Sequence, residues 1–417
     1  MSEAFIIDAV RTPRGLGKMG KGALSQMHPE HLAATVLASI KERNSLNTAD
    51  VDDVIWGVSG QIGLQAGDIG RMAALDAGYD VRASGVTLNR FCGSGLTAAN
   101  LAAGQIMAGM EDLVVAGGSE MLSYVTYYGM KQREAGLGSS GMGVGNPRLQ
   151  AKHPQSNQGV CADAVAAMEG ITRADLELLG LESQRRADHA IKEGRFAKST
   201  ITVCDDDGNV LLDHEEYPRP ETTAEGLAQL KPAFEMFHDM PSQPEGLTYV
   251  ELIKQKYPDL DIKPVHHVGI SSGVVDGAAA ILLASGDYAE KHGLKPRARI
   301  VAMANIGDDP TLMLNAPVPA AKKVLAKAGL TKDDIDVWEV NEAFAVVVEK
   351  FIRDLDLDRA KVNPNGGSMA LGHPIAATGA ILVGTALDEL ERTGGRYGLI
   401  TMCAAGGMAP AMIIERI

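Results

Sequence analysis

Short apolar runs alternate with amphipathic segments in the first part of this 417-residue chain. Four apolar runs are typical of buried strands: residues 4–9, 54–58, 86–88 and 113–118. Three segments between them have helical spacing: residues 31–40, 70–77 and 96–108. Strands that alternate with helices in this way predict an α/β fold with a largely parallel sheet.

The pattern changes between residues 123 and 267, where polar residues, Pro and Gly become frequent. This region includes a glycine-rich stretch at residues 136–145 and an amphipathic segment at residues 180–191. An excursion of this length is too long for a simple loop, so it predicts an inserted, partly helical loop domain. The α/β pattern resumes at residues 271–280 and continues into a strand at residues 281–284.

The chain also contains an internal repeat. Residues 50–58 match residues 334–340 with gaps, and each copy then reaches a turn, a small-residue helix, an apolar strand and a Gly-Gly pair. A duplication of this size predicts two similar α/β domains whose helix N-termini converge on one site, with Pro374 opening the second helix. We expect an N-terminal domain at residues 1–122 and 268–293, a loop domain at 123–267 and a C-terminal domain at 294–417.

Composition narrows the classes of function. The net charge of −14 argues against a nucleic-acid partner or an anionic membrane partner. Four cysteines in this length do not form a disulfide framework and fit a reducing compartment. The sequence shows no signal peptide and no apolar run long enough to cross a bilayer, so we expect a cytoplasmic protein.

The segment Asn-Arg-Phe-Cys-Gly-Ser-Gly-Leu at residues 89–96 places Cys92 at a turn between a strand end and a helix. Backbone N–H groups and the helix dipole favour an anion there. We therefore expect the pKa of the Cys92 thiol to lie below its usual value of ~8.5, which would make the sulfur a good nucleophile. A lone cysteine, however, is more often a buried packing residue.

Three later loops each set one reactive side chain among small residues: Asn341, His373 and Cys403. Taken alone, each has an ordinary structural explanation, as a turn-bonding amide, a helix-start residue or a buried strand cysteine. Together with Cys92 they form the usual combination of a nucleophile, its base and its orienting partners from distant loops. The other two cysteines, Cys161 and Cys204, lack such a setting and are interpreted as packing residues.

From end to end the chain resembles the thiolases, which include acetyl-CoA C-acyltransferases and 3-ketoacyl-CoA thiolases. The motifs at residues 89–96, 341–345, 372–374 and 403–407 carry the resemblance and follow the family's order. The resemblance implies two α/β domains in a five-layered αβαβα arrangement and a loop domain that helps to hold coenzyme A. It also implies a homodimer or a homotetramer.

The resemblance assigns a role to each motif residue. Cys92 would take the acyl group as a thioester, and His373 would accept its proton. Cys403 would be the second acid/base, acting at the α-carbon of acetyl-CoA. Asn341 would hold a water that, with His373, stabilises the enolate oxygen. The backbone N–H groups of Cys92 and Ala405 would form the oxyanion hole.

The resemblance also implies contacts with acyl-CoA and coenzyme A, which are substrates, so no cofactor is expected. It places Ser272 on the pantetheine arm, Arg219 near the adenine end and Phe344 as a further coenzyme A contact. No metal site is expected, because the adjacent His266 and His267 would point to opposite faces of a strand.

Three departures from the family pattern bear on the substrate. Many thiolases carry His-Met-Gly at the entrance of the acyl pocket, where this chain has Asn-Gln-Gly at residues 157–159. Residues 235–267 are longer than in short-chain biosynthetic members, and their role is not predicted. Ala405 stands where many members have Gly, so its N–H keeps its direction only if Ala tolerates the local φ.

These departures favour a degradative enzyme that cleaves 3-ketoacyl-CoA to acetyl-CoA and a shortened acyl-CoA by a ping-pong mechanism. A biosynthetic thiolase that condenses two acetyl-CoA to acetoacetyl-CoA stays an alternative. A 3-ketoacyl-ACP synthase would not carry Cys403 in this motif. A non-catalytic acyl-CoA or lipid-binding protein, or a scaffold subunit of β-oxidation, would bind coenzyme A without thiolysis.

Overall fold

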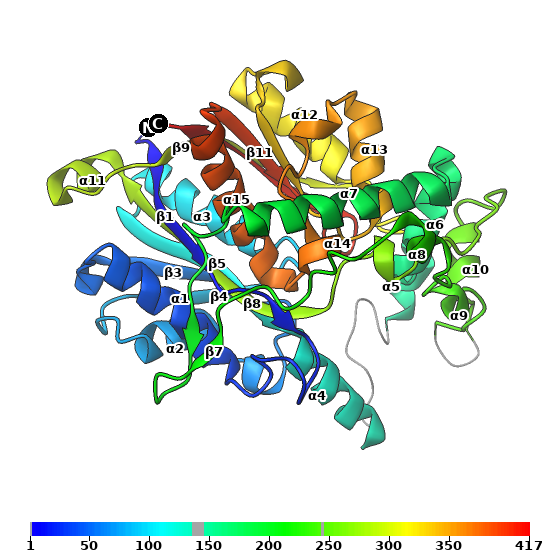
Figure 1. The fold of residues 1–417 in the computed structure, drawn as a ribbon, viewed down its shortest axis with the longest axis horizontal. Coiled ribbons are helices and arrows are strands. Elements are labelled where there is room, and N and C mark those ends of the chain that lie inside the picture. Colours follow the sequence, from blue (N-terminus) through cyan, green and yellow to red (C-terminus); the bar gives the residue numbers. More distant parts are fainter. Residues whose placement is uncertain (1, 136–145, 243–245) are drawn as a thin grey trace.

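The computed structural model describes residues 2–135, 146–242 and 246–417 (Figure 1). The glycine-rich stretch expected at residues 136–145 lies outside the described residues. Within them, helices and strands stack in five layers, α, β, α, β and α, as the sequence predicted. Three separate hydrophobic clusters fill the spaces on either side of the strands.

The first outer layer and the first half of the sheet are built from the N-terminal part of the chain. Helices α1 (Pro29–Arg43) and α2 (Ile69–Asp76) cover the outer face. The strands follow the order β4 (Val86–Leu88), β3 (Asp53–Gly57), β5 (Leu113–Met121), β8 (Val275–Ser285) and β1 (Ala4–Arg11), and β2 (Gly15–Leu16) pairs with β8.

The second half of the sheet comes from the C-terminal part. Its strands follow the order β9 (Ala298–Gly307), β12 (Met408–Arg416), β11 (Tyr397–Thr401) and β10 (Val337–Val340). Helices α12 (Pro317–Ala328) and α13 (Ala345–Leu355) cover its outer face. A short ladder between β1 and β9 joins the two halves, and α11 (Gly286–His292) connects β8 to β9.

Two helices form the middle layer, α3 (Ser94–Ala108) and α15 (Thr378–Thr393). Their apolar residues share one cluster with strands from both halves of the sheet. Small residues make this close packing possible. Gly95 of α3 and Gly118 of β5 both lie against the carbonyl oxygen of Ala376, where a side chain at either position would overlap it. The starts of the two helices are therefore held together.

The sheet is mixed rather than largely parallel, which corrects the expectation from the sequence. Among the strands of the described residues, the parallel ladders are β3–β4, β3–β5 and β10–β11, and the other ladders are antiparallel. For β5 and β8 the cause is the long excursion after β5. It begins and ends at the same edge of the sheet, so that Met121 pairs with Asp276 and β8 runs back along β5.

The internal repeat is visible as repeated hydrogen bonds. Asp52, just before β3, accepts from the N–H groups of Asp112 and Leu113 at 2.9 Å each. Asp336, just before β10, accepts from Arg396 at 2.6 Å and Tyr397 at 3.2 Å. In each half the same aspartate thus ties the start of one strand to the start of its parallel neighbour.

Glycine ends several helices by adopting a left-handed conformation, which other residues adopt only at a cost. The helices α3, α6 (Gln158–Glu169), α11, α12 and α15 all end in this way, at Gly109, Gly170, Gly293, Gly329 and Gly394. The predicted helix at residues 180–191 is the second half of a longer one, α7 (Arg173–Lys192), which begins at a capping box on Thr172.

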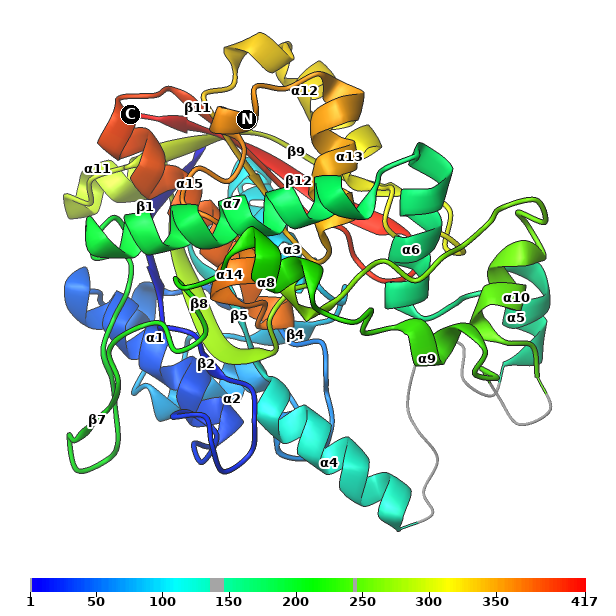
Figure 2. The same cartoon turned by 45° about the vertical axis from the view of Figure 1, so that its right-hand side comes forward.

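The excursion wraps around the molecule instead of forming one compact lobe (Figures 1 and 2). On one side lie α6 and the short helices α5 (Pro147–Lys152), α9 (Glu235–His238) and α10 (Tyr249–Lys254), whereas α8 (Ala224–Ala228) packs against α7. Helix α7 crosses the short α14 (Ser368–Leu371). The hairpin β6–β7 (Val203–Cys204 and Val210–Leu212) lies near α1, and α4 (Leu122–Glu134) projects from the sheet edge. The domain boundaries stay a prediction.

Within the described residues no helix is both long enough and apolar enough to span a membrane.

Candidate active site

Cys92 lies at the tip of a tight turn between β4 and α3. Gly93 and Ser94 donate their N–H groups to the carbonyls of Arg90 and Phe91, and Asn89 accepts from the N–H of Phe91 at 2.7 Å. Phe91 has a φ of +50°, a strained value for a residue with a large side chain. The hydrogen bonds of the turn hold Phe91 in this strained conformation and leave Cys92 two residues before the helix.

The expected low pKa of Cys92 is wrong. Burial raises the pKa of the thiol far above its usual value, and the nearby Cys403 and Glu120 raise it further. Its backbone N–H acts in the opposite direction but is the smallest contribution. The helix start therefore does not outweigh desolvation, and Cys92 is a neutral thiol in the free protein. It needs a base to become a nucleophile.

His373 lies on the connection between α14 and α15 and is 5% exposed. Its N–H donates to the carbonyl of Gly273 at 2.8 Å, which fixes the connection against the loop before β8. The sequence predicted that Pro374 opens α15, and this prediction is wrong. Pro374 opens a separate 3₁₀ turn (Ile375–Ala377), and α15 begins only at Thr378.

A directional chain of hydrogen bonds orients the imidazole. The hydroxyl of Ser368 donates to Oδ1 of Asn341 at 2.6 Å, which leaves the Asn341 amide NH₂ facing Nε2 of His373 at 3.5 Å. On the other side, Nδ1 of His373 lies 2.6 Å from the hydroxyl of Thr378. Nε2 is then the acceptor and Nδ1 carries the proton.

The charge state of His373 follows from its surroundings. Burial lowers the pKa of the imidazole to about 3, and the nearby Arg14 guanidinium lowers it further. His373 is therefore neutral at physiological pH, with a basic nitrogen available. A neutral thiol and a neutral imidazole are the resting forms of Cys92 and His373.

Cys403 lies on the loop that joins β11 to β12 and is 2% exposed. Burial raises the pKa of its thiol to about 12. The loop is closed by two hydrogen bonds between Ala404 and Met408, and its left-handed positions are Gly406 and Gly407. Ala405 is not among the residues with positive φ, so the methyl group there causes no backbone strain.

The four predicted residues come from loops that meet between the two halves. Asn341 and His373 contact each other, and Cys403 is close enough to Cys92 to influence its pKa. Glu120 links the loops as well. Its carboxylate accepts from the N–H groups of Ser59 and Gly60 at 3.0 and 2.9 Å and from the N–H of Ala376 at 3.3 Å.

The predicted coenzyme A residues lie on segments next to the catalytic loops. Ser272 donates its N–H to the carbonyl of Ala343, and the neighbouring Ser271 pairs with Phe344. Arg219 is exposed, and its guanidinium carbon lies 5.8 Å from the ring centre of Tyr217. The ring of Tyr217 in turn lies against Gly273, where a side chain would overlap it.

Sequence reasoning missed the residues that support the site. Thr378 and Ser368 orient His373 and Asn341, and Glu120 holds the loops together. Arg14 lies near enough to His373 to affect its pKa. Ser368 lies within the small-residue stretch that pointed to His373, but nothing in its spacing marks it as a partner of Asn341.

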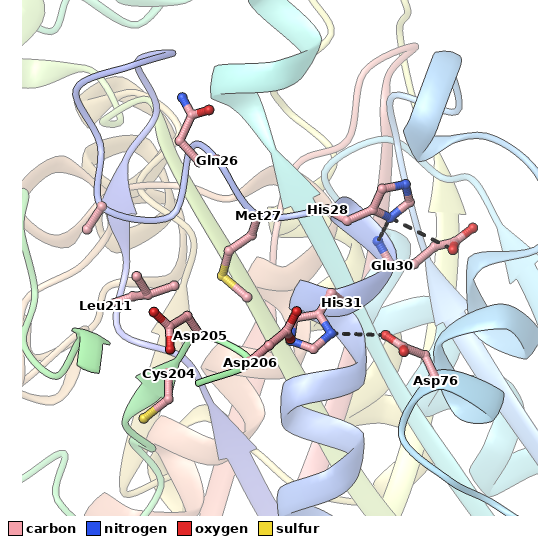
Figure 3. Close-up of a pocket in the computed structure, with 11 residues that line it drawn as sticks. Gln26, Met27, His28, Glu30, His31, Asp76, Cys204, Asp205, Asp206 and Leu211 are labelled. Carbon is pink, nitrogen blue, oxygen red and sulfur yellow. Dashed lines mark hydrogen bonds and ion pairs between the residues drawn. The ribbon is translucent and has the colours of Figure 1, made fainter. Parts of the chain in front are cut away.

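A surface cavity of about 600 Å³ lies elsewhere, between α1, α2 and the β6–β7 hairpin. Figure 3 shows its lining, where Nδ1 of His31 lies 3.1 Å from Asp76 and its Nε2 3.6 Å from Asp206. Cys204 also lines it, but no predicted site residue does. Because none of the predicted site residues lines this cavity, it is not part of the candidate active site.

Comparison with known proteins agrees with this geometry. Residues 4–237 match the family described as thiolase, N-terminal domain, and residues 294–416 match thiolase, C-terminal domain. A beta-ketoadipyl-CoA thiolase of Acinetobacter baylyi is 41% identical over 100% of both chains. A steroid 3-ketoacyl-CoA thiolase of Mycobacterium tuberculosis is 40% identical over 100% of this chain and 95% of that protein.

A solved structure is similar over the whole length. The crystal structure of the Bacillus anthracis acetyl-CoA acetyltransferase superposes with a TM-score of 0.82 at 33% identity, covering 100% of this chain and 99% of that one. With both family domains matched in order and full-length relatives at about 40% identity, this chain belongs to the thiolase family of acyltransferases.

Proposed function

We propose that this protein catalyses thiolysis of 3-ketoacyl-CoA to acetyl-CoA and a shortened acyl-CoA through an acyl-enzyme on Cys92. The observation that carries the proposal is the hydrogen-bond chain that leaves Nε2 of His373 unprotonated, with only a long 3.5 Å contact from the Asn341 amide, where the loops of two buried cysteines meet. Such an arrangement supplies a base for one sulfur while a second sulfur keeps its proton.

In the first half-reaction, His373 Nε2 takes the proton of Cys92 as the sulfur attacks the C3 carbonyl of the substrate. The backbone N–H groups of Cys92 and Ala405 stabilise the oxyanion that forms. The C2–C3 bond then breaks, and the enolate of acetyl-CoA leaves. A water held by Asn341, together with His373, stabilises the enolate oxygen, and Cys403 gives its proton to the α-carbon.

In the second half-reaction, the thiol of coenzyme A gives its proton to the Cys403 thiolate and attacks the thioester on Cys92. The shortened acyl-CoA leaves, and Cys92 recovers the proton that His373 held. The high pKa of the Cys403 thiol suits both steps, because a weak acid leaves a strong base once its proton has gone.

Burial of the reacting groups has a cost and a benefit. A resting thiolate would be destabilised in this site, so the free enzyme keeps Cys92 neutral. The same low polarity strengthens the interaction of the N–H groups with charge that develops during the reaction. One such donor contributes roughly 3 kcal/mol to transition-state stabilisation.

For the acyl group, we infer a substrate larger than acetoacetyl-CoA. Two relatives at about 40% identity are named for beta-ketoadipyl-CoA and for steroid 3-ketoacyl-CoA, which support a degradative role. A second candidate is acetoacetyl-CoA chemistry, which the similarity to an acetyl-CoA acetyltransferase favours. Coenzyme A would lie along Ser272 and Phe344 with its nucleotide end near Arg219.

The test is thiolysis of a panel of 3-ketoacyl-CoA esters with free coenzyme A, combined with mass spectrometry of the acyl-enzyme. The panel includes acetoacetyl-CoA, 3-oxoadipyl-CoA, a long straight chain and a ring-bearing chain. We expect acylation of Cys92 and faster cleavage of the larger substrates. Fastest cleavage of acetoacetyl-CoA would favour the second candidate. Coenzyme A binding without any cleavage would contradict both and indicate a binding or scaffold protein.

A further inference from the structure

One buried carboxylate, Asp163 on α6, holds together the segment that distinguishes this chain from short-chain thiolases. Its Oδ1 accepts from the N–H groups of Val265 and His266 at 3.1 and 2.9 Å, and from Nδ1 of His266 at 2.8 Å. Its Oδ2 accepts from Nε2 of His238 at 2.9 Å. The Asp163 side chain is 0% exposed.

The four donors make Asp163 a charged anchor. Burial by itself raises the pKa of the carboxyl, but donation from His238 and His266 holds it below its usual value. The carboxylate therefore stays ionised and keeps both imidazoles in place. Both histidines lie in residues 235–267, and they fix that segment to α6.

The two imidazoles differ in what their rings contact. The ring of His266 stands edge-on to Phe344, at 86° with 5.7 Å between ring centres. Phe344 stands in turn against Phe234, at 69° and 5.7 Å. We call Phe234, Phe344 and the ring of His266 the aromatic wall. Among the described residues, the ring of His238 makes no such contact with Phe344.

His266 also carries an unused polar atom. Its Nδ1–H donates to Asp163, which leaves Nε2 as the other polar atom of the ring. This atom is fully buried and has no hydrogen-bond partner within the described residues. Leaving such an atom unpaired is unfavourable for the folded state. A histidine kept at this cost points to a function for its position that an apolar ring would not supply.

The aromatic wall lies on segments that continue directly from the catalytic loops. Phe344 follows Asn341 by three residues and pairs with Ser271, next to Ser272. Phe344 belongs to the same apolar cluster as Cys403 and Ala405, and Phe91 and Phe234 pack against that cluster. Gly159, one helical turn before Asp163, lies directly on the ring of Phe234, where a side chain would overlap it. The anchor and the wall thus use the same face of α6.

We propose that Asp163 and His266 are positioning residues that set the aromatic wall against the acyl group carried by Cys92 and thereby select acyl groups larger than acetyl. The proposal rests on the thiolase function proposed above and extends it to the substrate. It also gives residues 235–267 a role: they bring the two histidines that fix the wall. Asn157 does not compete for this role, because its side chain caps α6 by accepting from the N–H of Gly159.

A matched pair of variants tests the proposal. In His266→Asn the amide nitrogen replaces Nδ1 and keeps the bond to Asp163, but the ring that contacts Phe344 is lost. In His238→Gln the amide nitrogen replaces Nε2 and also keeps its bond to Asp163, but the ring lost there forms no ring pair with Phe344 or Phe234 among the described residues. Both variants keep the anchor satisfied, so folding is preserved in each and is checked by thermal unfolding.

The measurement is kcat/KM for acetoacetyl-CoA and 3-oxoadipyl-CoA, expressed as a ratio for each protein. For His266→Asn we expect kcat/KM for 3-oxoadipyl-CoA to fall by about 10-fold relative to kcat/KM for acetoacetyl-CoA, which is the size of effect that a misfitted pocket produces. His238→Gln should keep the wild-type ratio. Asp163→Asn should shift the ratio in the same direction as His266→Asn, with little change for acetoacetyl-CoA.

Three results would overturn the proposal. Equal losses for both substrates would mean that the wall serves the pantetheine arm common to all of them. An unchanged ratio with a lower melting temperature would make Asp163 and His266 purely structural. Equal shifts in the two matched variants would remove the special role of the His266 ring. Failure of the thiolase function itself is recognised separately, because wild-type protein would then form no acyl-enzyme on Cys92 with either substrate.

Discussion

The two halves of the molecule share one plan but place their reactive residues differently. Asp52 and Asp336 make the same backbone bonds, and α3 and α15 begin at the same distance after them. Cys92, however, lies two residues before α3, whereas His373 lies five residues before α15. The 3₁₀ turn at Ile375–Ala377 fills the difference. Duplication thus supplies two converging helix starts, and a short irregular turn decides which side chain faces the site.

The strands that flank the middle layer differ as well. Counting from the shared aspartates, Glu339 of β10 occupies the position of Ile55 in β3. Ile55 packs in the central cluster, but both oxygens of the fully buried Glu339 have no hydrogen-bond partner within the described residues. Burial raises the pKa of the Glu339 carboxyl well above its usual value, and Glu342 and Glu389 raise it further. The second half therefore carries a stability cost that the first half avoids.

The largest effect should come from the nucleophile of the first half. Cys92→Ser should lower kcat for thiolysis by about 10⁴-fold or more, because no acyl-enzyme forms at a useful rate. Steady-state kinetics and intact mass after incubation with substrate measure this. Cys204→Ser is the matched control, since Cys204 lies at the distant hairpin. Normal turnover of Cys92→Ser would rule out the assigned role.

A second large effect should distinguish the role of the Cys403 sulfur, in the second half, from that of the Cys92 sulfur, in the first half. In Cys403→Ala, Cys92 should still be acylated by an acyl-CoA, but cleavage of the carbon–carbon bond should fall by about 10³-fold, since the acid for the α-carbon is gone. Acylation is followed by mass and cleavage by absorbance. Cys161→Ala, another fully buried cysteine, should cleave normally. Parallel loss of both steps in Cys403→Ala would contradict the division of labour.

A smaller effect should come from the group that orients His373. Thr378→Val removes the partner of Nδ1 and should lower kcat/KM by about 10- to 100-fold, the range typical of losing an orienting partner of an imidazole. Thr385→Val, which removes a hydroxyl farther along the same helix, is the control.

Since burial lowers the pKa of His373 to about 3, the activity of the wild-type protein should not fall through protonation of this base between pH 8 and pH 5. A fall centred near pH 6.5 would contradict this.

The smallest effect concerns stability and tests the difference between Ile55 and Glu339. The folded-state pKa of Glu339 is raised, so its neutral form fits the core and the cost of ionisation grows as pH rises above about 4.3. Glu339→Gln should therefore gain stability relative to wild type with increasing pH, by about 1–3 kcal/mol by pH 8. Urea unfolding between pH 4.5 and pH 8 measures the difference. A constant difference across this range would show that the pKa of Glu339 is the same in the folded and unfolded states, which would contradict the effect of burial.

The sequence predicted much of the fold because its signals are local. The apolar runs marked β1, β3 and β5, and the alanine-rich segment marked α3 almost to its ends. The antiparallel direction of β8 was not predictable, because it depends on where the long excursion leaves and rejoins the sheet. The early part of β8 is rich in Gly and Ala, and it forms a strand because it is buried between β1 and β5.

The same division applies to the site. The motifs identified Cys92, Asn341, His373 and Cys403, because each is set among small residues at a turn. The pKa of Cys92 could not be judged from a helix start, since desolvation in the assembled core outweighs the local N–H groups. Thr378 and Ser368 were missed because they matter only through contacts made in three dimensions.

The pattern of residues was sufficient to identify the duplicated α/β plan, the turns that carry the reactive side chains and the family to which the chain is similar. Those properties depend on residue type, periodicity and short-range spacing. The tertiary structure alone decided the protonation states of Cys92 and His373, the contact between His373 and Asn341, and the anchoring of two histidines on Asp163. These depend on burial and on distances between residues far apart in the chain, which no local pattern specifies.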